Sequence, residues 1–251
     1  MSRAGRLALA VAVVAFGSDA WAEQTCSDAP DAETSGDLAA LVQRLTVVLT
    51  DYPSLDEAWR EQAPILCLSD QLFAEQGYFE PKTNRIVLNS QISQDFQLAI
   101  LIHEVRHLQQ FDGGSCPSVD YRMMDYIRAR LALEADASAV GVYIAWQLRE
   151  AGDPGPWDVL QNWPTHDDLV ARFAETIAAG EDEVAAASAT FAEWFARADR
   201  REIYTFAICS NYLDSLDREK VAAGKATLPN DYASRLCVLP DGRPYACTLP
   251  P

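Results

Sequence analysis

The spacing of hydrophobic positions along the chain predicts a mainly helical protein. From Leu38 to Leu49, leucine and valine recur every three or four residues, the period of an amphipathic helix that should end near Tyr52. Residues 152–165 hold three prolines and two tryptophans, so this segment is expected to be irregular. The helical period predicts further helices over about 55–62, 93–111, 119–151, 181–197 and 200–218, and one that is capped by Thr165.

Short apolar runs bounded by Pro, Gly or Asn predict strands over 65–68, 72–79 and 85–88, the last two joined by a turn over 81–84. The expected fold class is therefore α+β and mainly α-helical, with a small two- to three-stranded sheet before the helix over 93–111. The last helices should pack together through an apolar set: Phe191, Trp194, Phe195, Ile203, Tyr204, Phe206 and Ile208.

The first 22 residues have the pattern of a secretory signal peptide. Arg3 and Arg6 precede an unbroken apolar run over 7–16, and Ala20-Trp21-Ala22 places small residues where a signal peptidase cleaves. The run is shorter than the ~20 apolar residues that a membrane span needs. We therefore expect cleavage after Ala22, no stable membrane anchor afterwards, and a mature chain of residues 23–251 that forms a single domain.

All six cysteines lie in this mature chain, and an even number of cysteines in an exported protein favours disulfides. Up to three bridges can form. Cys237 and Cys247 flank a turn-like Pro-Asp-Gly sequence, so we expect the first bridge between them. The protein is expected to be periplasmic or secreted.

Acidic residues outnumber basic residues 37 to 20, for a net charge of −17. Removing residues 1–22 takes away two arginines and one aspartate, which leaves 36 acidic against 18 basic residues, or about −18. Such a charge repels a phosphate backbone, so we expect no nucleic-acid partner. The oligomeric state stays open.

The sequence His103-Glu104-Val105-Arg106-His107 is an HExxH motif within the predicted helix over 93–111. Positions i and i+4 share one helix face, so both imidazoles can reach one metal ion. A catalytic zinc site has three protein ligands and one open position, and we expect one Zn²⁺ per chain. Glu104 lies beside the pair as the candidate general base. The alternative is a pair of satisfied core histidines beside a surface glutamate.

A third ligand is expected from the helix over 119–151. Glu134 lies on the stripe of this helix that otherwise faces inward, where an unpaired carboxylate would be costly. Asp136, Asp120 and His166 are the alternatives, because each of these side chains can bind zinc.

These residues resemble the gluzincin class of zinc metallopeptidases, in which a second helix supplies a glutamate ligand. They resemble more closely uncharacterised bacterial families of metallopeptidase type, which combine His-Glu-x-x-His-x-x-Gln, here 103–110, with Glu-Ala-Asp-Ala, here 134–137. The resemblance covers about 85–150. It implies a zincin-like helical core in which His103, His107 and Glu134 hold the metal ion.

Gluzincins often carry an aspartate four residues after the glutamate, where it orients a histidine. Ser138 occupies that place here, which makes Asp136 the candidate for this task.

Hydrolysis also needs a donor aimed at the developing oxyanion. His166 is our candidate for this role, in competition with Tyr121, Tyr126 and Tyr143. An exposed histidine near a helix start is the plainer interpretation of His166.

The resulting hypothesis is an exported zinc metallopeptidase that hydrolyses peptide or amide bonds in a peptide or protein substrate. The strand expected over 85–89 would offer an edge for an extended peptide. The alternative is a non-catalytic secreted binding or structural protein, with a structural metal site or none.

Overall fold

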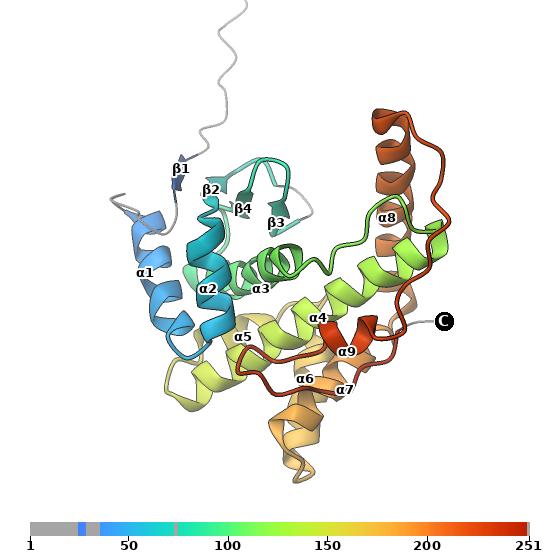
Figure 1. Ribbon diagram of the computed structural model, residues 1–251. Helices are drawn as coiled ribbons and strands as arrows, with labels where there is room; N and C mark the ends of the chain where they lie inside the picture. Colours follow the sequence, from blue (N-terminus) through green and yellow to red (C-terminus); the bar gives the residue numbers. More distant parts are fainter. Residues whose placement is uncertain (1–24, 29–35, 73–74, 250–251) are drawn as a thin grey trace, which may run out of the picture.

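A computed structural model describes residues 25–28, 36–72 and 75–249 (Figure 1). The expected signal peptide over 1–22 lies outside the described residues. The elements in chain order are β1 (Thr25–Asp28), α1 (Asp37–Leu49), α2 (Pro53–Gln62), β2 (Ile65–Ser69), β3 (Gly77–Glu80), β4 (Arg85–Asn89), α3 (Gln94–Asp112), α4 (Met123–Glu150), α5 (Gly155–Gln161), α6 (Asp167–Ala178), α7 (Glu183–Trp194), α8 (Ala198–Glu219) and α9 (Tyr232–Leu236).

The four described strands form one sheet in the order β1-β2-β4-β3. β2 and β4 are parallel, and β1 and β3 pair antiparallel with them. The predicted turn over 81–84 is confirmed as the link between β3 and β4. β3 pairs with one edge of β4 and β2 pairs with the other, so β4 has no free edge. The expectation that residues 85–89 offer an edge is therefore wrong, and β3 is the edge strand.

The described sheet has four strands, where the sequence predicts two or three. The added strand, β1, comes from an acidic segment with no strand pattern. Cys26 of β1 lies opposite Cys67 of β2 in the strand register, and the two form a disulfide. The covalent link and the pairing hold this segment in the sheet, and neither is visible in local sequence.

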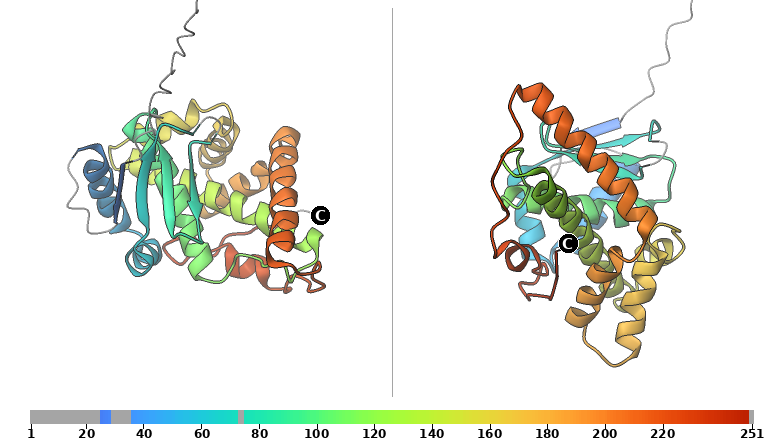
Figure 2. Two further views of the ribbon diagram at one scale, coloured as in Figure 1. Left: turned by 90° about the horizontal axis from the view of Figure 1, so that it is seen from above. Right: turned by 90° about the vertical axis from the view of Figure 1, so that its right-hand side faces the viewer.

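Two long helices carry the core of the α+β, mainly helical fold that was predicted. α3 packs beneath the sheet and contacts α1, α2 and α4. α4 crosses the molecule and also contacts α5, α6, α7 and α8. The left view of Figure 2 shows α8 standing apart from the sheet, and the right view shows it running along α4. Between them, α3 and α4 therefore contact most of the other helices.

Two expectations about the segment before α6 are wrong. Residues 152–165 are not wholly irregular, because α5 begins at Gly155 with Pro156 in its first turn. Proline is tolerated there, since the first N–H groups of a helix have no partner within it. Thr165 does not cap α6, whose N-cap is His166; its hydroxyl is instead 2.9 Å from His166 Nδ1.

α8 is less buried than its apolar residues suggest. Tyr204 and Ile208 face the protein, but the side chains of Ile203 and Phe206 are 67% and 76% exposed. The expectation that all of these residues pack in the core is therefore wrong for two of them. Apolar residues at three- and four-residue spacing surround this helix, so periodicity alone could not tell its two faces apart.

The predicted bridge between Cys237 and Cys247 is confirmed. Among the described cysteines, Cys116 and Cys209 are free thiols. None of the helices in the described part of the chain combines the length and the hydrophobicity that a membrane span requires.

Candidate metal centre

α3 presents the two histidines of the HExxH motif on one face. The helix begins after Ser93, whose hydroxyl accepts a hydrogen bond from the backbone N–H of Phe96, and Asp95 adds negative charge to its first turn. His103 and His107 lie one turn apart, and their Nε2 atoms are 3.0 Å from each other. Both imidazoles therefore point their outer nitrogens at the same place, as the spacing predicts.

α4 brings Glu134 to this pair. Its Oε2 atom lies 3.5 Å from Nε2 of His107 and 3.8 Å from Nε2 of His103. One ligand atom from each of the three residues lies within 4.8 Å of the others. Ala135 and Ala137 are fully buried, and their small side chains suit the close approach of α4 to α3. The three side chains are 16–17% exposed, so the group can be reached from outside.

The donor set fits a divalent metal ion. Burial alone would raise the pKa of Glu134, but the neighbouring imidazoles hold it well below its usual range. Burial opposes a charge on His107, but the Glu134 carboxylate raises the pKa of His107 to about 9. Two imidazole nitrogens and a carboxylate are the ligands that zinc takes in catalytic sites. A cation at this point, either a proton or a metal ion, is thus stabilised by the ionised carboxylate.

Glu104 is buried beside the two histidines. It is 5% exposed, so the alternative of a surface glutamate is wrong. Burial raises the pKa of Glu104; the imidazoles of His103 and His107 and a hydrogen bond from the backbone N–H of Phe79 in β3 oppose this rise. A carboxyl group whose pKa is moved towards neutrality can take up and return a proton.

His166 lies at the start of α6 and is buried, with 8% of its surface exposed. The plainer expectation of an exposed histidine is therefore wrong. Its ring stacks on Trp163, with centroids 3.9 Å apart and planes 3° from parallel. Burial and the nearby charges of His103 and Arg200 lower the pKa of His166 well below its usual value. The imidazole is therefore neutral at pH 7.

Two of the three alternative third ligands, Asp136 and Asp120, are engaged with other residues. The Asp136 carboxylate accepts hydrogen bonds from Arg106, Gln110 and Tyr245, which use the oxygens that a metal would need. Asp120 is an exposed residue of the loop between α3 and α4, where its Oδ2 accepts a hydrogen bond from the Ser118 hydroxyl.

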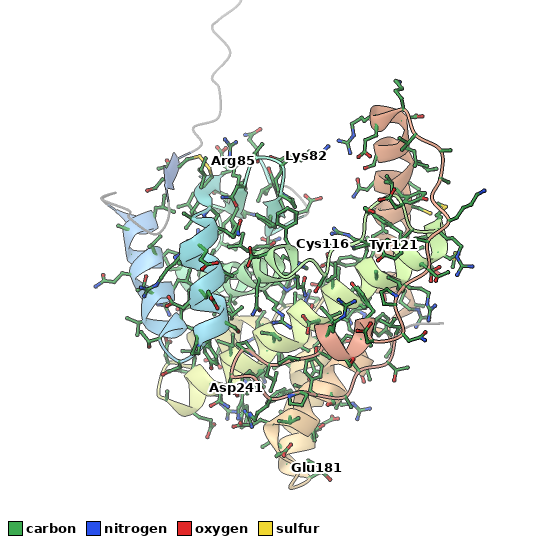
Figure 3. All side chains as sticks on the ribbon, in the orientation of Figure 1. Lys82, Arg85, Cys116, Tyr121, Glu181 and Asp241 are labelled. Atoms are coloured by element: carbon green, nitrogen blue, oxygen red, sulfur yellow. A yellow bond between two sulfur atoms is a disulfide. The ribbon has the colours of Figure 1, made fainter. Side chains whose placement is uncertain are left out.

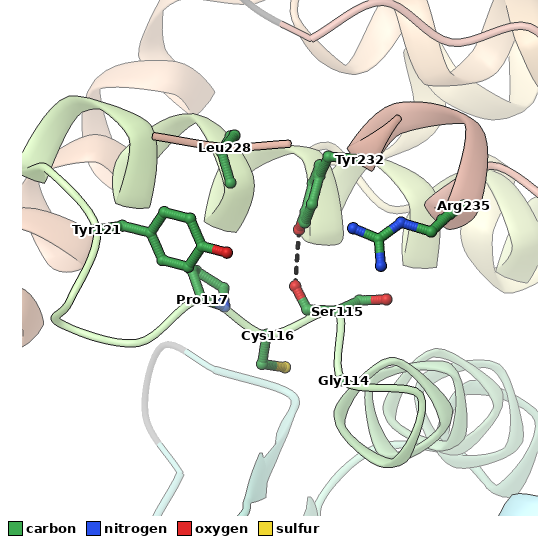
Figure 4. Close-up of a pocket in the computed structure, with 8 residues that line it drawn as sticks. All are labelled: Gly114, Ser115, Cys116, Pro117, Tyr121, Leu228, Tyr232 and Arg235. Atoms are coloured by element: carbon green, nitrogen blue, oxygen red, sulfur yellow. Dashed lines mark hydrogen bonds between the residues drawn. The ribbon is translucent and has the colours of Figure 1, made fainter. Parts of the chain in front are cut away.

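The competing tyrosines also have other surroundings. Tyr143 donates a hydrogen bond to Asp241, which lies in the lower left part of Figure 3, away from Tyr121 on the right. Tyr126 packs against Tyr212 of α8. Tyr121 lines a small pocket with Cys116 (Figure 4), and none of the residues lining that pocket is a member of the histidine–glutamate group.

A family model described as "Putative metallopeptidase family (DUF6782)" matches residues 19–247, far more than half of the chain. The chain belongs to this metallopeptidase family. Membership implies a hydrolase that uses a metal ion to cleave a peptide or protein substrate, and the group of His103, His107 and Glu134 offers a place for this ion. No curated protein and no solved structure matches the chain.

Sequence reasoning missed one residue at the centre of this metallopeptidase. Tyr204 of α8 is half-buried, and burial together with the charges of Glu134 and Glu104 raises the pKa of its phenol. The phenol therefore lies within the electrostatic field of both carboxylates. The spacing of Tyr204, Ile208 and Tyr212 marks the inward face of α8, but no local pattern links that face to the HExxH helix.

Proposed function

We propose that this protein is an exported, zinc-dependent peptidase of the gluzincin type. His103, His107 and Glu134 would hold one Zn²⁺ per chain, and Glu104 would act as general base. The observation that carries the proposal is the convergence of two imidazole nitrogens and one carboxylate oxygen within 4.8 Å, on two packed helices. The donor types favour zinc, and three protein ligands leave one coordination position open.

When bound, the ion would polarise the scissile carbonyl and lower the pKa of the attacking water. The Glu104 carboxylate would take a proton from that water and return it to the leaving amine. Three features of Glu104 support this role: its burial, its raised pKa and its position next to His103.

His166 and Tyr204 are the proposed donors to the oxyanion. For His166 this role requires the Thr165 hydroxyl, 2.9 Å from Nδ1, to donate to that nitrogen, which would place the hydrogen of the neutral imidazole on Nε2. The raised pKa of Tyr204 keeps its phenol protonated and able to donate. Two neutral donors aimed at the substrate oxygen would stabilise the negative charge that develops on it.

The edge strand β3 is the proposed docking site for an extended substrate. The backbone N–H of Asn89 donates to the carbonyl of Gln76, so in the antiparallel register the backbone groups of Gly77 and Phe79 point away from β4. The Phe79 N–H donates to Glu104, and a peptide can pair with the remaining outward groups as an added strand. The hydrogen bond from Phe79 to Glu104 brings this edge next to the general base.

Export belongs to the same proposal. Residues 1–22 would be removed as a signal peptide, and 23–251 would form a single domain in the periplasm or outside the cell. The two disulfides, Cys26–Cys67 and Cys237–Cys247, support an oxidising compartment.

The variant Glu104→Gln tests the catalytic part of the proposal. Hydrolysis of a peptide or protein substrate should fall by about 10²–10⁴-fold, because the amide cannot take up the proton. Zinc content, measured by elemental analysis, should stay the same. Glu61→Gln, an exposed position on α2, is the matched control and should keep full activity.

A wild-type protein that binds one zinc ion but cuts no member of a broad peptide and protein panel would contradict a catalytic role. Activity retained by Glu104→Gln would remove Glu104 as the base. The first result would favour the alternative of a structural metal site in a non-catalytic protein.

A further inference from the structure

Both ring nitrogens of His107 have a neighbour. Nε2 faces the metal centre, and Nδ1 faces the interior of the protein. The Nδ1 atom lies 2.7 Å from Oε1 of Gln110, one turn further along α3. The amide nitrogen of Gln110 donates to the backbone carbonyl of Leu133 at 3.0 Å and to Oδ2 of Asp136 at 2.7 Å. Gln110 therefore connects a proposed metal ligand to the interior of the protein.

The contacts of Gln110 determine which way round its amide lies. A carbonyl oxygen and a carboxylate only accept hydrogen bonds, so the NH₂ group must face Leu133 and Asp136. Its oxygen must then face His107, where it can only accept. Nδ1 of His107 consequently carries a hydrogen, so Nε2, which points towards His103 and Glu134, is the nitrogen that gives up its proton when a metal ion binds.

We infer that Gln110 is a positioning residue that fixes the tautomer and the ring orientation of His107 for metal binding. This inference rests on the proposed function, because it assumes that His107 binds the metal ion. Groups that hydrogen-bond the inner nitrogen of a histidine ligand commonly set its orientation and contribute to metal affinity. Asp136 was expected to orient a histidine ligand, and it contacts His107 only through the side-chain amide of Gln110.

Asp136 anchors the amide. It is completely buried, and its two oxygens accept two hydrogen bonds from Arg106, at 2.7 and 3.0 Å, one from Gln110 and one from the hydroxyl of Tyr245 at 2.5 Å. The paired guanidinium compensates for the burial of the carboxylate charge. With these partners in place, Gln110 cannot turn over without leaving buried polar groups unpaired.

The C-terminal segment also takes part in this hydrogen-bond network, through its contacts with Arg106. Arg106 Nη2 donates to the backbone carbonyls of Leu236 and Val238, at 2.9 and 3.0 Å. The backbone N–H of Tyr245 donates to the carbonyl of Cys237, whose disulfide to Cys247 ties the segment to itself. A part of the chain remote from the HExxH motif thus helps to hold His107 in position.

A pair of matched variants tests the inference. Gln110→Met keeps the shape of the side chain and removes both of its hydrogen-bonding groups. Gln97→Met is the control: it lies on the same helix, is 3% exposed like Gln110, and donates to the backbone of Asn89 and not to a metal ligand. Zn²⁺ affinity should fall about 10–100-fold in Gln110→Met and stay near the wild-type value in Gln97→Met. Chelator competition measures this affinity.

Nitrogen NMR of the histidine rings supplies a second readout that a loss of packing alone would not change. The chain has three histidines, so the His107 signals can be assigned with single variants. In the zinc-loaded wild type, His107 should appear as the Nδ1–H tautomer with a slowly exchanging ring proton. In Gln110→Met this proton should exchange rapidly, while the urea midpoints of both metal-free variants stay comparable.

Equal zinc affinities for Gln110→Met and the wild type would overturn the inference, as would a His107 ring that lacks the Nδ1 proton in the zinc-loaded wild type. A wild type that binds zinc but hydrolyses nothing would contradict the proposed catalytic function and leave the role of Gln110 standing. The two failures are therefore distinguishable.

Discussion

A buried histidine that stays neutral makes stability depend on pH. The pKa of His166 is well below its usual value in the folded protein, and in the unfolded chain it returns to about 6.5. Below that value the unfolded chain binds a proton that the folded protein does not. The free energy of unfolding should therefore fall as the pH drops below about 6.5, and recover as it rises.

His166→Phe keeps a ring on Trp163 and removes the titration. Between pH 7 and pH 5 the free energy of unfolding of the wild type should decline more steeply than that of the variant, by up to about 1.4 kcal/mol per pH unit. Urea unfolding of both proteins at several pH values measures the difference. Identical slopes would mean that His166 titrates normally in the folded protein.

At the scale of single residues, the sequence alone predicted which side chains lie together where their positions depend on local helix geometry. His103, Glu104 and His107 lie together because helix geometry places them so, and the cost of burying Glu134 pointed to its partners. Tyr204 could not be found in this way, because its approach to Glu134 depends on how α8 packs on α4.

At the scale of elements, β3 depends on a close contact with α3. A Cβ atom on Gly77 would lie 2.6 Å from Cγ2 of Ile100 and 2.9 Å from Cδ2 of Leu88. Any side chain at this position would push the edge strand away from the HExxH helix. The opposite case is Gly141 in the middle of α4, where a Cβ would meet nothing within 4 Å.

These two glycines form a matched pair of alanine variants. Gly77→Ala should lower the free energy of unfolding by about 1–3 kcal/mol through overpacking, and should also reduce peptidase activity because it moves the backbone that contacts Glu104. Gly141→Ala should raise stability by about 0.5–1 kcal/mol, since alanine is the better helix former. Urea unfolding and kcat/KM measure both effects. A Gly77→Ala protein as stable and active as the wild type would contradict the close packing of β3.

Helices and turns with local signals were predictable from sequence. The Ser93 cap of α3 and the turn over 81–84 are examples. The order of the strands was not predictable, because β2 and β4 pair across the intervening β3 hairpin. β1 escaped prediction for a similar reason, as a disulfide to Cys67 holds an acidic segment in the sheet.

At the scale of the whole molecule, the candidate site draws on four separate parts of the chain. α3 and α4 supply the three proposed ligands, the start of α6 supplies His166, and α8 supplies Tyr204. The sequence located the first two parts through a motif and its spacing. His166 was a candidate from its chemistry alone. α8 and the C-terminal segment that contacts Arg106 meet the site only through tertiary packing, so no sequence pattern indicated them.

The metal content of the mature protein, residues 23–251, tests the central claim most directly. Purified from an oxidising compartment and supplied with zinc, the wild type should hold one zinc ion per chain, and so should Glu104→Gln. His103→Ala and Glu134→Ala should lose the ion, because two ligands hold it too weakly. Zinc retained by Glu134→Ala would contradict the proposed ligand set. A wild type that binds no metal would contradict the proposed site and the peptidase mechanism built on it.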